Sequence, residues 1–154
     1  MANTIIFLYS YHHMNTQKIC NAIAAKINAA VFDLSKKTEP VDLGKYDLVG
    51  FGAGIDSRRH YPQIVQYAEK LAQVKNKNAF IFSTSGIYSE RKMHKDHKFL
   101  RDILQNKGFK IAGEFSCRGY NTNSVLKFIG GMNKGRPNSE DLKNAEIFAC
   151  SLIF

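Results

Sequence analysis

The residues with the clearest capacity for chemistry lie in a polar turn near the N-terminus. Residues 10–16 read Ser-Tyr-His-His-Met-Asn-Thr. They follow the short apolar run Ile5–Leu8, which favours a buried strand, and they end in a pair that starts helices. The first turn of a helix has free N–H groups and a partial positive charge. The stretch therefore predicts a phosphate-binding turn made by Ser10, His12, His13, Met14, Asn15 and Thr16.

Two other interpretations of this turn have less support. The turn could merely cap the helix that follows, but two adjacent histidines are a poor choice for a simple cap. It could instead hold a catalytic histidine pair or a metal, but no carboxylate or thiol partner lies nearby in the sequence. Imidazole N–H groups, by contrast, donate readily to phosphate oxygens.

Two later turns have small residues that suit a planar ligand. One apolar stretch runs through residues 46–52 and leads into a Gly-Ala-Gly sequence, and another at residues 78–83 leads into Ser-Thr-Ser-Gly. Small side chains let the backbone approach a ligand closely, and backbone N–H groups can bind its polar edge. The expected contacts are Ala53, Gly54, Ile55, Ser83, Thr84, Ser85 and Gly86. Tyr61 and Tyr88 are either stacking partners for such a ligand or ordinary surface side chains.

The elements that position these turns alternate between strand and helix patterns. Strands are predicted at residues 5–8, 30–34, 46–52, 78–83 and 109–117, and helices at 16–28, 62–72, 99–107 and 139–152. Residues 53–61 and 87–98 are expected to be loops, the second basic and aromatic. This alternation predicts an α/β fold, with an open parallel sheet covered by helices on both faces. Ligands of such sheets bind beyond the carboxyl ends of the strands, where the three turns lie.

Length and composition predict one soluble domain over residues 1–154. The chain is long enough for a real core, with 44% apolar residues. It has no apolar run long enough for a transmembrane segment and no pattern of a signal peptide, so a cytoplasmic location is expected. Its three cysteines, Cys20, Cys117 and Cys150, form no metal motif and are expected to be reduced. Cys117 is expected to be a buried packing residue rather than a redox thiol.

The chain carries an excess of positive charge, with 22 Lys and Arg against 13 Asp and Glu. No nucleic-acid-binding motif accompanies this charge, so no nucleic-acid partner is expected. The basic residues concentrate in two clusters, Arg58-Arg59-His60 and Arg91–Lys98. Both clusters lie in the predicted loops after the third and fourth strands.

The order of these parts resembles the flavodoxin family over nearly the whole chain. The resemblance is carried by the opening strand with Ser10–Thr16, by the strand Tyr46–Gly52 and by the strand end Phe82–Gly86. It implies a flavodoxin-like three-layer sandwich with a five-stranded parallel sheet in the order 2-1-3-4-5. It also implies FMN as the cofactor, with its phosphate on the first turn and its ring between the two later loops.

The phosphate turn departs from the flavodoxin motif in its middle. Flavodoxins usually have Ser/Thr-x-Thr-Gly-Asn-Thr, whereas this turn is one residue longer and has His12-His13 where Thr-Gly is expected. The resemblance therefore carries over Ser10, Asn15 and Thr16 as phosphate ligands, and it assigns no role to the two histidines.

The function that the resemblance implies is electron transfer by bound FMN between redox partner proteins. An alternative on the same scaffold is a flavin-dependent quinone or protoporphyrinogen oxidoreductase. A third is a flavin-free domain that binds another phosphorylated ligand. The basic clusters reverse the usual sign of charge around the flavin in this family. They are expected to dock partners with acidic surfaces and to stabilise the reduced, anionic flavin.

Overall fold

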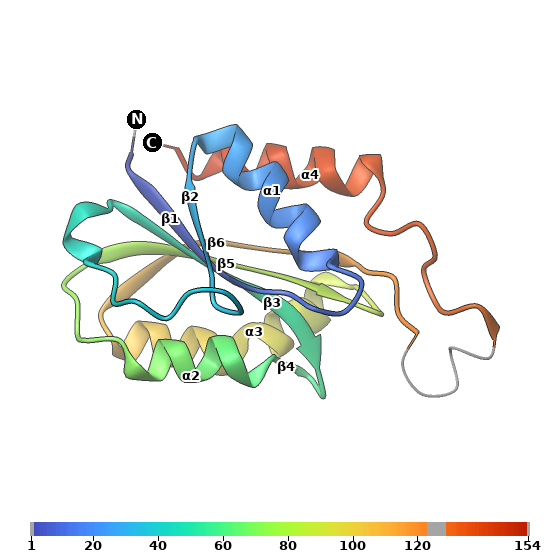
Figure 1. The fold of residues 1–154 in the computed structure, drawn as a ribbon, viewed down its shortest axis with the longest axis horizontal. Helices are drawn as coiled ribbons and strands as arrows, with labels where there is room; N and C mark the ends of the chain where they lie inside the picture. Colours follow the sequence, from blue (N-terminus) through green and yellow to red (C-terminus); the bar gives the residue numbers. More distant parts are fainter. Residues whose placement is uncertain (1, 123–128, 154) are drawn as a thin grey trace.

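A computed structural model describes residues 2–122 and 129–153. A parallel sheet forms its middle layer, in the strand order β2-β1-β3-β5-β6, and a short strand β4 pairs antiparallel with β3 (Figure 1). Counted without β4, this is the expected order 2-1-3-4-5, and the predicted flavodoxin-like class is confirmed. The strands are β1 (Thr4–Tyr9), β2 (Ala30–Asp33), β3 (Leu48–Asp56), β4 (Arg59–His60), β5 (Lys77–Ser85) and β6 (Phe109–Arg118).

Helices cover both faces of the sheet, with α1 and α4 on one face and α2 and α3 on the other (Figure 1). Successive side chains of a strand point to opposite faces. In β1, Ile5 and Phe7 therefore enter the core under α2 and α3, whereas Ile6 and Leu8 enter the core under α1 and α4. The helices are α1 (Asn15–Ile27), α2 (Pro62–Lys70), α3 (Glu90–Asn106) and α4 (Ser139–Ser151), with a short 3₁₀ helix η1 (Leu43–Lys45).

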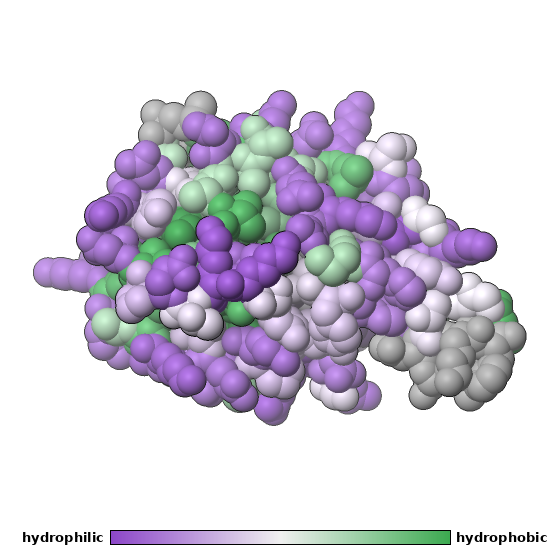
Figure 2. Space-filling model, in the orientation of Figure 1, coloured by the Kyte–Doolittle hydropathy of each residue, from purple (hydrophilic) through white to green (hydrophobic). Residues whose placement is uncertain are grey.

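The outer surface is mostly polar. Figure 2 shows polar side chains over most of the face turned to the viewer, with apolar ones chiefly between the two helical layers, where the edge strand β2 lies. Within the described part of the chain, no helix is both long and apolar enough to cross a membrane.

The prediction of a loop over residues 87–98 is wrong, because α3 already begins at Glu90. Ser89 caps the helix, and its hydroxyl accepts a hydrogen bond from the N–H of Lys92 at 3.1 Å. The buried face of the first half of α3 includes Asp96 and His97. Two polar residues thus occupy core-facing positions that are usually apolar in a helix. Hydrophobic spacing therefore does not predict the first half of α3.

The third and fourth parallel strands are longer than predicted. β3 continues through Ala53, Gly54 and Ile55 to Asp56, so these three residues lie in a strand and not in a loop. It then turns back through Ser57 and Arg58, both with positive φ, into β4. β5 likewise includes Ser83, Thr84 and Ser85. α2, in contrast, ends at Lys70 rather than at residue 72.

Glycines in β3 make room for aromatic rings of the neighbouring strand. Gly52 is the register partner of Phe82. A Cβ atom on Gly52 would lie 2.1 Å from the Phe82 ring, far inside van der Waals contact. The ring therefore lies across the backbone of β3, and a side chain at Gly52 would displace it.

We predict that Gly52→Ala destabilises the protein by about 1–3 kcal/mol, because overpacking forces the buried Phe82 ring to move. The measurement is urea denaturation followed by circular dichroism. Gly44→Ala is the matched control, since its added Cβ would meet only the flexible carboxylate of Asp42, at 3.0 Å. Equal stabilities of the two variants would contradict the packing argument.

Candidate functional site

The turn between β1 and α1 has an unusual backbone. His13 and Met14 are both left-handed, with φ of 53° and 52°. Met14 is the N-cap of α1, and its side chain makes no capping hydrogen bond. Instead, the buried Ser10 reaches across the turn, and its Oγ accepts the N–H of Gln17 at 3.2 Å. A left-handed backbone costs free energy in residues other than glycine, so the rest of the structure holds this turn in place.

Asn15 and Thr16 tie the turn to other parts of the chain. The Asn15 amide donates to the carbonyl of Tyr120 at 2.8 Å, and Thr16 Oγ1 lies 2.8 Å from Thr84 Oγ1. The second contact joins the first turn of α1 to the end of β5. Asn15 Oδ1 is buried and has no hydrogen-bond partner within the described residues. A buried acceptor without a partner is unfavourable and suits a ligand that donates to it.

His12 and His13 contact Thr122 in this structure. The N–H of Thr122 donates to His12 Nε2 at 3.2 Å, and His13 Nε2 lies 2.7 Å from Thr122 Oγ1. The rings of His13 and Tyr120 are 4.3 Å apart. Burial, followed by the neighbouring His13, lowers the pKa of His12, and a hydrogen bond with the Asn121 side chain opposes that shift. The two histidines thus hold residues 120–122 against the turn.

The end of β3 lies beside this turn, and the ring of Tyr61 packs against it. A Cβ on Gly54 would lie 2.6 Å from the ring of Tyr61, which is only 8% exposed. Burial, and then Tyr11, raises the pKa of Tyr61 to about 12. Ala53 is fully buried, and Ile55 pairs with His60 in the β3–β4 hairpin. Tyr61 is therefore a packing residue.

The exposed aromatic side chain at this place is Tyr11, which the sequence reasoning did not select. It is 60% exposed, and its ring centroid lies 5.0 Å from that of Tyr61. The other predicted stacking residue, Tyr88, is 40% exposed and lies farther along, next to β6. The sequence signal for Tyr11 is its position inside the predicted phosphate turn.

The three polar residues at the end of β5 point to alternate faces. Ser83 Oγ lies 2.7 Å from His97 Nε2 under α3, whereas Thr84 faces α1. Ser85 Oγ accepts from the Lys92 ammonium at 3.1 Å, and Lys92 also pairs with Asp96. Beyond the strand, the carbonyl of Gly86 accepts from the Asn133 amide at 2.6 Å. The side chains of Ser83, Thr84 and Ser85 are thus bonded within the protein.

A buried polar network lies under this strand end. His97 is fully buried, and its Nδ1 lies 3.1 Å from Glu114 Oε1. Arg101 donates to both oxygens of Glu114, at 2.8 and 3.0 Å. On the other side, Ser83 Oγ lies 2.9 Å from Ser116 Oγ. The network therefore links α3, β5 and β6.

A second buried histidine touches this network. The His60 ring lies 4.7 Å from the His97 ring, and its Nε2 lies 3.2 Å from the carbonyl of Phe82. A carbonyl only accepts, so Nε2 carries the proton. His60 Nδ1 is buried without a partner among the described residues. Burial, and then His97, holds the pKa of His60 well below its usual range, so His60 is neutral.

The two basic clusters lie side by side on the hairpin and on α3. The Arg59 guanidinium stacks on the Phe99 ring at 4.1 Å, and Lys98 pairs with Asp102 at 2.5 Å. Arg58 and Lys95 line the same shallow surface, and neither has an ion-pair partner among the described residues. The cluster is thus partly neutralised from within α3 and keeps an excess of positive charge.

The thiol of Cys117 is unsuited to redox chemistry in this structure. It is buried, and burial, followed by Asp141, raises its pKa to about 12. Reactivity of cysteine requires the thiolate. No group of three His, Cys, Asp or Glu side chains suited to a metal ion occurs in the described part of the chain.

A family model described as a flavodoxin domain matches residues 6–140. The chain belongs to the flavodoxin family. It is also 44% identical, over 149 residues and 97% of both chains, to an uncharacterised protein of Methanocaldococcus jannaschii.

Solved flavodoxins share the fold of the chain at low sequence identity. Oxidised flavodoxin 1 of Bacillus cereus superposes with a TM-score of 0.71 at 15% identity, covering 98% of this chain and 97% of its own. A flavodoxin, WrbA-like protein of Agrobacterium tumefaciens gives 0.67 at 15% identity, with coverages of 99% and 95%. The family and the architecture both agree with the strand order β2-β1-β3-β5-β6 and with helices on both faces of the sheet.

We predict that the stability of the protein falls as the pH drops below about 6.5, because the unfolded chain then binds protons that buried His60 excludes. His60→Gln keeps a donor for the Phe82 carbonyl. It should reduce the slope of the free energy of unfolding against pH by up to about 1.4 kcal/mol per pH unit. Urea denaturation between about pH 5 and 8 measures it. The exposed His94→Gln is the control, and parallel profiles for wild type and His60→Gln would contradict the prediction.

Proposed function

We propose that the protein binds FMN and carries electrons between redox partner proteins. The observation that carries the proposal is the junction at the carboxyl edge of the sheet. There the first turn of α1, whose N-cap residue Met14 makes no side-chain capping bond, meets the end of β5 through Thr16 and Thr84. The phosphate would bind at this turn, to Ser10, His12, His13, Met14, Asn15 and Thr16.

The residues of the turn fit a phosphorylated flavin. The N-terminus of α1 favours an anion because the helix dipole places partial positive charge there. The N–H groups of Asn15 and Gln17 already donate, to the His12 carbonyl and to Ser10 Oγ. Asn15 Oδ1, the buried acceptor without a partner among the described residues, suits a hydroxyl group such as those of a ribityl chain. Ser10 already holds one N–H of the helix, which orients the turn before a ligand arrives.

The ring would lie against backbone rather than against polar side chains. Ala53, Gly54 and Ile55 on one side, and Ser83 to Gly86 on the other, present main chain at neighbouring strand ends. Tyr11 is the exposed aromatic side chain suited to cover such a ring on the hairpin side. FMN supplies one-electron chemistry when bound, and the protein supplies binding, exclusion of water and local charge.

The charges around this edge favour partners with acidic surfaces. Arg58, Arg59 and Lys95 present positive charge beside the hairpin, and complementary charges speed the encounter of two proteins. The buried, reduced thiols of Cys20 and Cys117 support a cytoplasmic location, and the composition supports a single domain over residues 1–154.

We predict that replacing both His12 and His13 by Ala weakens the binding of FMN at least about tenfold and leaves the binding of riboflavin almost unchanged. The reason is that a charged hydrogen bond to phosphate is worth about 1.5–3 kcal/mol. Fluorescence titration of the flavin measures both affinities. FMN binding should also strengthen as the pH falls from about 8 to 6, because a phosphate favours protonated His12.

Riboflavin is the internal control in this experiment. If the histidines only hold residues 120–122 in place, both flavins will weaken equally in the double variant. A protein that prefers neither FMN nor riboflavin would refute the phosphate site altogether.

We predict that Arg58→Gln/Arg59→Gln makes the reduction potential of bound FMN more negative by tens of millivolts. A positive charge near the ring stabilises its reduced, anionic form by about 1 kcal/mol at a partly wet site. A redox titration measures the shift. Lys26→Gln/Lys110→Gln is the control, because it removes two exposed charges from α1 and from the start of β6. The same shift in both variants would mean that only net charge matters.

A further inference from the structure

Thr122 contacts both histidines of the phosphate turn. Its N–H donates to His12 Nε2 at 3.2 Å, and its Oγ1 lies 2.7 Å from His13 Nε2. Its methyl group lies next to Gly131, where an added Cβ would be 3.0 Å from Thr122 Cγ2. Thr122 therefore occupies the Nε2 atom of each histidine.

The residue before Thr122 is fixed without the help of the histidines' Nε2 atoms. The Asn121 N–H donates to the carbonyl of Met132 at 2.9 Å, and the Met132 N–H donates back to the carbonyl of Asn121 at 2.7 Å. Among the described residues, the hydrogen bonds of Thr122 are those with the two histidines. Thr122 is therefore the point at which this segment can separate from the turn.

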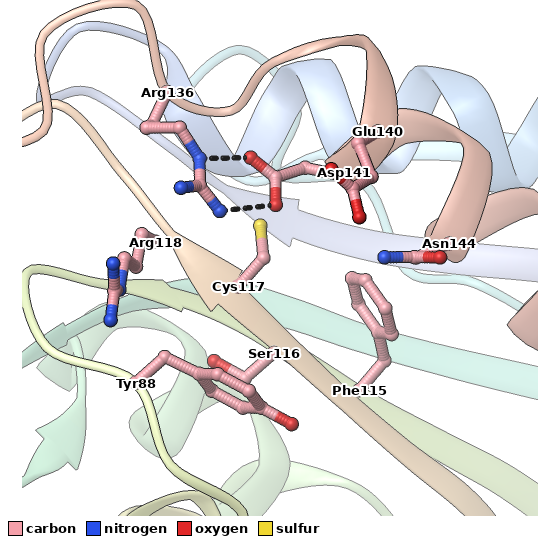
Figure 3. A pocket seen from close by; sticks show the side chains of 9 residues that line it. All are labelled: Tyr88, Phe115, Ser116, Cys117, Arg118, Arg136, Glu140, Asp141 and Asn144. Atoms are coloured by element: carbon pink, nitrogen blue, oxygen red, sulfur yellow. Dashed lines mark hydrogen bonds and ion pairs between the residues drawn. The ribbon is translucent and has the colours of Figure 1, made fainter.

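Tyr120, one residue farther back, is held on two sides. Its carbonyl accepts from the Asn15 amide at 2.8 Å, and its N–H donates to the carbonyl of Arg136 at 2.9 Å. Figure 3 shows the Arg136 guanidinium bonded to Asp141, beside a hollow of about 500 Å³ at the end of β6. A separation at Thr122 thus leaves the base of the segment in place.

The two contacts of Thr122 respond differently to a proton. A backbone N–H only donates, so His12 Nε2 is unprotonated and the neutral ring carries its proton on Nδ1. The Thr122 hydroxyl both donates and accepts, so its contact with His13 is compatible with either form of that ring. A proton on His12 Nε2 would set two donors against each other. Protonation of His12 therefore removes the acceptor of the Thr122 N–H.

The surroundings of His12 keep its ring neutral while this contact is made. Burial, followed by the neighbouring His13, lowers the pKa of His12, and a hydrogen bond with the Asn121 side chain opposes that shift. Tyr11 lies next to it on the turn, with its ring centroid 6.4 Å away. In the described part of the chain, no carboxylate is among the groups that shift this pKa. A phosphate at the turn would supply the opposite charge that favours the protonated ring.

We propose that Thr122 is a latch on the phosphate turn, which competes with phosphate for His12 and His13 and is released when His12 takes up a proton. This inference rests on the proposed function, because it takes the turn as the phosphate site. The proton comes from solvent and stays on the imidazole, and no covalent bond forms or breaks. A phosphate oxygen accepts from the protonated Nε2, so proton and phosphate open the latch together.

The latch makes the turn selective for ligands that carry a phosphate. A ligand without an anionic acceptor does not replace the contacts of Thr122, whereas phosphate oxygens accept from both imidazoles. The closed latch also reduces the apparent affinity for phosphate, in proportion to the fraction of molecules in which the latch is open. Loss of the Thr122 hydroxyl should therefore strengthen phosphate binding.

The first test is an NMR titration of the ligand-free full chain between about pH 5 and 8. The ring ¹⁵N shifts of His12 report its protonation, and the amide ¹H shift of Thr122 reports its hydrogen bond. We expect the Thr122 amide signal to move upfield with the same midpoint as the titration of His12. His12→Gln offers an acceptor that does not titrate, so its Thr122 signal should stay constant. His13→Gln is the matched control, in which the Thr122 amide should still titrate.

The second test repeats the titration with inorganic phosphate, and with chloride at the same ionic strength as the control. Phosphate should move the midpoint of the His12 titration upward by at least about one pH unit and should release the Thr122 amide. Thr122→Val loses the hydroxyl contact and keeps the backbone N–H. It should bind phosphate about two- to tenfold more tightly, which corresponds to one neutral hydrogen bond.

The possible results separate the latch from the phosphate site. A Thr122 amide that does not respond to protonation of His12 would overturn the latch. Phosphate that binds while this amide stays bonded, or equal or weaker phosphate binding by Thr122→Val, would do the same. Absence of phosphate binding would instead overturn the competition and the proposed phosphate site together, and the first test would still show whether protonation of His12 releases Thr122.

Discussion

The burial of β5 between two helical layers determines what its last three side chains contact. Because side chains alternate along a strand, Ser83 and Ser85 face α3 and Thr84 faces α1. The buried Ser83 and Thr84 must satisfy their hydroxyls within the protein, since water does not reach a buried strand. The partners that do so come from elements distant in sequence. This one strand end therefore joins the β1–α1 turn, the N-terminal half of α3 and the edge strand β6.

The same constraint explains why polar groups are buried in α3. His97 and Asp96 occupy core-facing positions because Ser83 and Lys92 need partners there. Glu114 and Arg101 complete the network with an ion pair in which Arg101 Nη1 donates to both carboxylate oxygens. A partly satisfied buried network costs more than an apolar core, and within the described residues the unpartnered atom next to this network is His60 Nδ1. That position makes the stability of the fold sensitive to protons.

The carboxyl edge of the sheet thus has two neighbouring regions with different chemistry. Around β1 and β3, the start of α1, a left-handed turn and exposed Tyr11 suit a phosphorylated planar ligand. Around β6 and α4, two guanidinium groups and two aromatic rings border a hollow. β5 lies between them, and its side chains bond in both directions.

The sequence by itself determined the architecture and the location of the candidate phosphate turn. Apolar runs of strand length alternating with helical patterns suffice for this, because both faces of a parallel sheet are buried. The tertiary structure alone decided the start of α3, the burial of Tyr61 under Tyr11 and the contacts of His12 and His13 with Thr122. These contacts join residues 50 to 110 positions apart or place polar side chains in a core. Hydrophobic spacing carries no information about such pairings, since it reports which side of an element is buried and not which polar groups meet there.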